Sequence, residues 1–164
     1  MKLSVTHTID GPPAAFWSRY LDPAWVQQLH LSALGSTSAD VVEQEGTYGA
    51  GPVTRTFRYG QSPDLPGPLR KLFGDEVVST EQGTFDPEAE RWTFTLTPGS
   101  LADKTKVSGS MSTKDNGDGT TELAFTMEAK VKLIGVGGIA EKFIERQARE
   151  GQDKTVAYVN ADLS

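Results

Sequence analysis

Two side chains able to do chemistry stand where strand alternation predicts a buried face. His7 alternates with apolar residues near the N-terminus, and Arg55 does so in the middle of the chain. An inward imidazole can act as a general base or hold a ligand by a hydrogen bond, although it is also common as a hydrogen-bonded core residue. An inward guanidinium needs an anionic partner, either the carboxylate of Glu81 on the next expected strand or an acid or phosphate group of a ligand. A one-residue change of register would instead expose Arg55.

The last third of the chain predicts a long helix whose inward face is underfilled. A helical pattern runs from near Ile139 almost to the end, with Ile139 on the inward side. The middle of the inward stripe holds small and polar residues: Ala140, Gln147, Gly151, Thr155 and Tyr158. A helix that only fills a core would carry Leu or Ile there, so this stripe predicts a cavity. Gln147 and Tyr158 are the candidates for orienting a ligand in it.

The elements that must position these side chains are a strand, two short helices, six further strands and the long helix. Asp10-Gly11-Pro12-Pro13 and Asp22-Pro23 mark the starts of the short helices, which end near His30, expected to be a surface or capping group. The later strands are expected at 37–46, 51–60, 75–84, 90–97, 105–114 and 120–133. This order predicts a single α+β domain over 1–164, in which a curled antiparallel sheet wraps around the C-terminal helix in a helix-grip arrangement.

Aromatic and thioether side chains on the inward faces would supply an apolar wall for such a cavity, although any globular core needs many of them. Together with the polar candidates above, the predicted ligand-binding residues are His7, Phe16, Tyr20, Arg55, Phe57, Tyr59, Trp92, Phe94, Met111, Phe125, Met127, Phe143, Gln147, Gly151 and Tyr158.

The segment 60–74 interrupts the series of strands. Its three prolines exclude a strand, and its apolar residues favour one or two turns of helix. We predict a lid over the cavity mouth, formed by Leu65, Leu69, Leu72 and Phe73. The alternative is a loop whose leucines pack on the sheet edge.

Composition excludes several classes of function. The net charge of −6 and a pI near 4.9 disfavour nucleic-acid binding, and no apolar run reaches the length of a membrane span. The absence of cysteine removes disulfides and thiolate ligands, and no metal site or cofactor is expected. The acidic residues Asp115, Asp118 and Glu122 fit a turn better than a calcium loop. The N-terminus alternates at once, so we expect no signal peptide and a cytoplasmic location.

The order of elements, with Asp22-Pro23 closing the first helix, resembles the START-like helix-grip superfamily (the SRPBCC group). Within it, local motifs resemble a bacterial family of unknown function: Leu65-Pro66 before a short hydrophobic piece, Asp75 to Gln82, Gly117 to Leu123, and Val131 to Lys142. The glycine run from Gly135 to Gly138 is longer than the single pair expected. The resemblance covers essentially the whole chain. It implies a central hydrophobic pocket and no catalytic residues.

We therefore expect a protein that binds a small hydrophobic ligand, such as a lipid, sterol-like or polyketide-like compound, between sheet and helix. One alternative is a cyclase or dehydratase in which His7, Arg55 or Tyr158 does acid–base work in the same cavity. Because only His7 and Arg55 form a candidate set of inward ionisable groups, binding is favoured over catalysis. A further alternative is a ligand-free protein-interaction module that uses 60–74. No stable membrane insertion is expected, and no protein partner is indicated.

Overall fold

The computed structural model describes all residues, 1–164. Its elements follow one another as β1 (Lys2–Ile9), α1 (Pro13–Tyr20), α2 (Pro23–Ser32), β2 (Ser38–Glu45), β3 (Val53–Gln61), α3 (Gly67–Phe73), β4 (Val77–Asp86), β5 (Arg91–Pro98), β6 (Thr105–Asp115), β7 (Thr121–Val131) and α4 (Gly137–Leu163). Every predicted element is present, and the bounds predicted for β2 to β7 agree with the observed ones to within two residues at every end.

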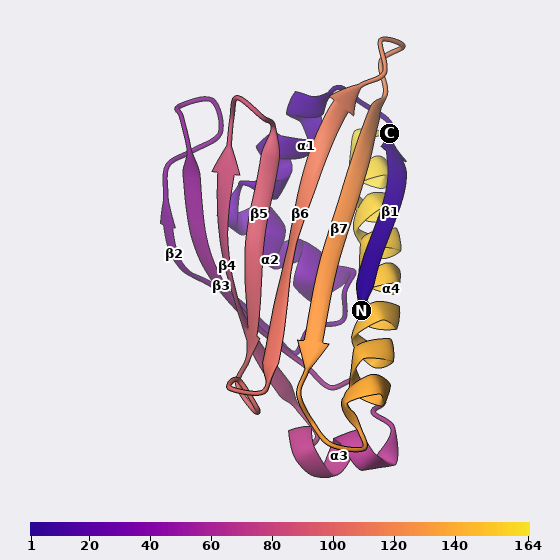
Figure 1. The fold of residues 1–164 in the computed structure, drawn as a ribbon. Coiled ribbons are helices and arrows are strands. Elements are labelled where there is room, and N and C mark those ends of the chain that lie inside the picture. Colours follow the sequence, from indigo (N-terminus) through magenta and orange to yellow (C-terminus); the bar gives the residue numbers. More distant parts are fainter.

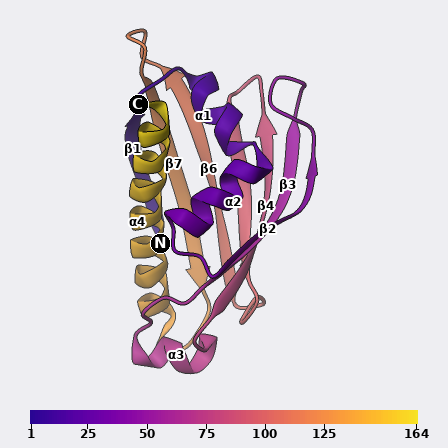
Figure 2. The same cartoon turned by 180° about the vertical axis from the view of Figure 1, so that it is seen from behind.

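The seven strands form one antiparallel sheet in the order β1-β7-β6-β5-β4-β3-β2. Consecutive strands from β2 to β7 are neighbours, and β1 completes the sheet by pairing with β7. Figures 1 and 2 show that α1, α2 and α4 lie on the same face of this sheet, with α3 at one end. The curled sheet and its long C-terminal helix confirm the predicted helix-grip fold.

The starts of the short helices follow the sequence signals. Asp22 caps α2, because its Oδ1 accepts a hydrogen bond of 3.0 Å from the backbone N–H of Ala24, and Pro23 occupies the first helical position. Helix α1 begins at Pro13, after Pro12, which has no side chain able to cap it. Helices α1 and α2 therefore follow β1 one after the other and lie over the concave face of the sheet (Figure 2).

The core lies between the sheet and the helices that cover it. Its largest cluster contains 17 buried residues, among them Phe16, Trp17 and Trp92, each with no exposed surface. Trp17 Nε1 donates a hydrogen bond of 2.8 Å to Thr113 Oγ1, which satisfies the buried indole. Gly83 on β4 makes room for Trp92, since a Cβ at position 83 would lie 1.9 Å from the indole.

Helix α4 begins two residues before the predicted start. Its inward face is centred on Ala140, Thr155 and Val159, which are all buried. Ile139 was predicted to face inward but is 42% exposed, because it lies one residue's rotation away from that stripe. The Met1 ammonium fixes the edge strand to the helix through a 2.7 Å contact with Glu141 Oε1.

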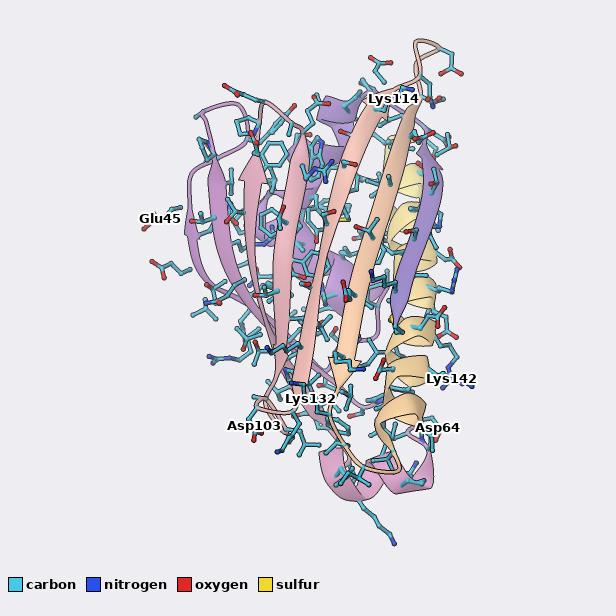
Figure 3. All side chains as sticks on the ribbon, viewed as in Figure 1. Glu45, Asp64, Asp103, Lys114, Lys132 and Lys142 are labelled. Carbon is cyan, nitrogen blue, oxygen red and sulfur yellow. The ribbon has the colours of Figure 1, made fainter.

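Charged side chains lie mainly on the outside of the molecule. Glu45, Lys114 and Lys142 project away from the ribbon in Figure 3. No helix is long and apolar enough to span a membrane.

Candidate ligand-binding cavity

A cavity of about 250 Å³ lies between the concave face of the sheet and α4. It is lined by 29 residues, of which 18 are hydrophobic. They come from all four helices, from β3 to β7 and from the segments beside α2 and α3, while β1 and β2 contribute none. A cavity of about 150 Å³ is enough for a single aromatic ring, so this one has room for a larger guest.

The helix side of the cavity is the small and polar stripe seen in the sequence. Ala140, Gln147, Gly151 and Thr155 all line it. No atom lies within 4 Å of the position that a Cβ at Gly151 would take, so the glycine borders open space. Thr155 Oγ1 donates a 2.8 Å hydrogen bond to the Gly151 carbonyl and thereby satisfies its hydroxyl within the helix.

The structure brings nine of the fifteen predicted ligand-binding residues together on the cavity wall. These nine are Tyr20, Tyr59, Phe94, Met111, Phe125, Met127, Phe143, Gln147 and Gly151. Three of the four predicted lid residues, Leu65, Leu69 and Phe73, also line the cavity, whereas Leu72 points outward and is 39% exposed. Helix α3, which carries Leu69 and Phe73, lies at one end of α4 and of the sheet (Figure 2).

The other six predicted residues lie elsewhere: His7, Phe16, Arg55, Phe57, Trp92 and Tyr158. His7 lies between β1 and α4, where its Nε2 is 2.8 Å from Asp153 Oδ1. Tyr158 packs against Trp25, with ring centroids 5.4 Å apart. Phe16, Phe57 and Trp92 are core residues, with exposures of 2% or less.

Arg55 is buried, as its alternation predicted, but it forms no ion pair. Its Nη1 donates a 2.6 Å hydrogen bond to the Tyr20 carbonyl oxygen, and its Nε has no partner. The guanidinium carbon lies 5.0 Å from the centre of the Tyr20 ring and 4.9 Å from that of Trp92. The aromatic faces therefore stabilise the cation in place of the predicted contact with Glu81.

His30 lies on the cavity wall, in contrast to the surface or capping role predicted for it. Its ring packs 4.6 Å from that of Phe57 and 4.7 Å from that of Tyr59, and its Nδ1 is 3.1 Å from Ser36 Oγ. Burial, reinforced by the charge of Arg55, lowers the pKa of His30 to about 4. The imidazole is therefore neutral at pH 7.

Glu81 provides the one carboxyl group on the cavity wall. Its carboxyl group forms no hydrogen bond. The Trp92 indole lies near, but the indole Nε1 does not meet the geometry of a hydrogen bond with it. Burial raises the pKa of Glu81, while the charge of Arg55 opposes that shift. Burial also raises the pKa of the Tyr20 and Tyr59 phenols, which therefore stay neutral. From the sequence, Glu81 was considered only as a partner for Arg55 on the neighbouring strand. That position predicted an ion pair and gave no indication that the carboxyl group lines the cavity.

The polar groups on the wall can orient a bound molecule or exchange a proton with it. No three His, Asp or Glu side chains cluster as metal ligands would. The chemistry available is therefore that of a neutral imidazole, two phenols and a carboxyl group facing an apolar space.

Solved structures with the same fold cover the whole chain. The protein TTHA0849 from Thermus thermophilus has a TM-score of 0.73 and 18% identity, and all of both chains is covered. The Zhui aromatase/cyclase from Streptomyces sp. R1128 has a TM-score of 0.73 and 13% identity, with 100% of this chain and 96% of that chain covered. A START superfamily protein from Mycobacterium smegmatis has a TM-score of 0.68 and 13% identity, with 99% of each chain covered. At these identities the likeness is one of fold.

No curated protein matches the sequence. A family model described as "Protein of unknown function (DUF2505)" matches residues 4–161.

Proposed function

Because the chain belongs to this DUF2505 family of proteins of unknown function, membership assigns no activity, and we propose from the cavity itself that the protein binds a small hydrophobic molecule. The observation that carries the proposal is the open space beside Gly151, bordered by an otherwise apolar wall. Desolvation of the guest supplies affinity, and the few polar groups fix its orientation. Lipids, sterol-like and polyketide-like compounds are the candidate classes, and the likeness to a Streptomyces aromatase/cyclase supports the last of them.

In this proposal α3 acts as a lid. Leu65 and Leu69 pack with Val131 and Ala140 in a small cluster of buried residues that is separate from the main core. Such a cluster can open without disrupting the large core, so a guest enters between α3 and the start of α4. Since three of the four apolar lid residues face the cavity, this role has more support than a protein-interaction surface on the same segment.

The test is to fill the cavity from the helix side. Gly151→Leu places a branched side chain in the open space, whereas Gly138→Leu adds the same side chain at the exposed start of α4, where a Cβ also meets no atom within 4 Å. N-phenyl-1-naphthylamine, a neutral probe that brightens in apolar surroundings, should bind the wild type and Gly138→Leu and should not bind Gly151→Leu. Equal binding by all three proteins would contradict the proposal. Native mass spectrometry of the purified protein would identify a molecule that co-purifies.

A second candidate function is an enzyme of cyclase or dehydratase type. The specific observation in its favour is that neutral His30 and Glu81, whose pKa is raised, share one cavity, because such a pair can take and give protons. The residues first expected to do this work, His7, Arg55 and Tyr158, all lie outside the cavity wall. Loss of turnover in Glu81→Gln, with ligand binding retained, would identify the enzyme once a substrate is known.

A further inference from the structure

The cavity wall carries no side chain with a positive charge at neutral pH. Its 29 residues include no lysine or arginine, and His30 is neutral because burial and the charge of Arg55 lower its pKa to about 4. Arg55 does not reach the wall, since it is held by the Tyr20 carbonyl and packed between aromatic rings. A carboxylate or phosphate brought into this space would lose its water and find no counter-ion.

The wall does carry an unpaired acceptor. Glu81 lies opposite Phe57 on β3 and Leu96 on β5. Its carboxyl group is buried, and the nearby charge of Arg55 acts on it without forming an ion pair. The Trp92 Nε1 and the Arg55 Nε, which lie near it, both lack a hydrogen-bond partner, so neither donates to it. It is the one carboxyl group that faces the space. A ligand that donates a hydrogen bond to such a buried, unpaired group binds more tightly, because the group otherwise has no partner.

We propose that the cavity selects neutral, mainly apolar molecules that carry a hydroxyl group, and that the hydroxyl is received by Glu81. A hydroxyl donates to the carboxylate and can also accept from the protonated acid, so it pairs with either form of Glu81. This inference rests on the proposed function and narrows it, because carboxylates, including fatty acids, are excluded from the cavity.

The size of the cavity limits the apolar part of the guest. Its volume of about 250 Å³ exceeds the roughly 150 Å³ that holds one benzene ring. Two fused rings are a suitable probe, and the naphthalene series supplies three molecules of one shape. Naphthalene has no polar group, 2-naphthol adds a hydroxyl, and 2-naphthoate adds a carboxylate.

The experiment measures the affinity of the wild type and two Glu81 variants for the three probes by titration calorimetry at pH 7. The wild type should bind 2-naphthol roughly tenfold more tightly than naphthalene, the ratio that one hydrogen bond of ordinary strength provides. Glu81→Leu removes the acceptor, so the two affinities should become equal or reverse. Glu81→Gln keeps a polar partner and should keep most of the preference for 2-naphthol. Glu128→Leu makes the same change on the exposed face of β7 and should leave the ratio unchanged.

The outcomes separate this inference from the function on which it rests. Naphthalene binding with no preference for 2-naphthol would overturn the role of Glu81 and leave hydrophobic binding intact. A preference that survives in Glu81→Leu would also overturn it, as would 2-naphthoate binding as tightly as 2-naphthol. If no probe binds, both proposals fail. Circular dichroism establishes that each variant is folded, and the wild-type ratios test the inference even where a variant does not fold.

Discussion

Acid should destabilise this protein through His30, because its buried imidazole is harder to protonate in the folded state than in the unfolded chain. Folding lowers the pKa of His30 from an ordinary value of 6.5 to about 4, first through burial and second through the charge of Arg55. Since the folded state resists protonation, the stability associated with this neutral imidazole is fully present above pH 6.5. It is lost progressively as the pH falls toward 4 and below.

The magnitude follows from the size of the shift. The fall in pKa from 6.5 to about 4 corresponds to roughly 3 kcal/mol, most of which should be lost between pH 7.5 and pH 4. This loss is a large part of the stability of an ordinary domain, for which ~5–15 kcal/mol is typical. Replacement by Gln keeps a neutral polar side chain beside Ser36 and cannot gain a proton, so His30→Gln should not show this component of the loss.

The assay is urea unfolding at a series of pH values between 7.5 and 4, for the wild type and for His30→Gln. Carboxylates titrate in both proteins, so the difference between the two curves isolates His30. That difference should change by about 3 kcal/mol across the series. His7→Gln removes the other histidine, which lies beside Asp153 at the edge of the molecule, and should retain the loss due to His30. A change below ~1 kcal/mol between wild type and His30→Gln would refute the assignment of His30 to a desolvated site.

Three further substitutions test the packing around the cavity. Gly83→Ala places a Cβ 1.9 Å from the Trp92 indole, so it should lower the free energy of unfolding by at least about 1–3 kcal/mol, measured by urea denaturation. Leu69→Ala removes the fully buried side chain of α3 and should cost about 2–5 kcal/mol in the same assay, together with faster release of N-phenyl-1-naphthylamine in stopped-flow experiments. Gly151→Ala meets no neighbour and should raise the free energy of unfolding by up to ~1 kcal/mol, because alanine favours the helix; no gain would show that the site is more crowded than the structure indicates.

The sequence predicted the fold well because the strands alternate clearly and the breaks between them contain Gly, Pro, Asn and Asp. Strand β7 shows this best, since every second residue from Thr121 to Val131 is buried. The helix stripe likewise predicted the cavity, because Ala140 and Gly151 are too small to fill the space that their positions face. Local periodicity was sufficient for these features.

Contacts between distant elements could not be predicted in the same way. Periodicity places Tyr158 on the inward side of α4, but it does not reveal that Trp25 of α2 packs against it there or that Tyr158 lies off the cavity wall. His30 lies at the end of a helix and gave no pattern to read, and its burial follows from the docking of α2 against Phe57 and Tyr59. The partner of Arg55 was also misjudged, because a backbone carbonyl and aromatic faces leave no signal in the sequence.

The open space beside Gly151 lowers the stability of the protein but leaves room for a ligand. On the scale measured for engineered cavities, about 24 cal/mol per Å³, filling even part of the 250 Å³ should stabilise the protein. A glycine inside a helix also lowers the free energy of unfolding by ~1 kcal/mol relative to alanine. If this space serves a ligand, Gly151→Leu should raise the unfolding temperature while it abolishes probe binding, because the added side chain fills the space and favours the helix. Gly138→Leu should also favour the helix but leave the cavity open. A Gly151→Leu protein that is destabilised, or that still binds the probe, would show that the space is not available as the structure indicates.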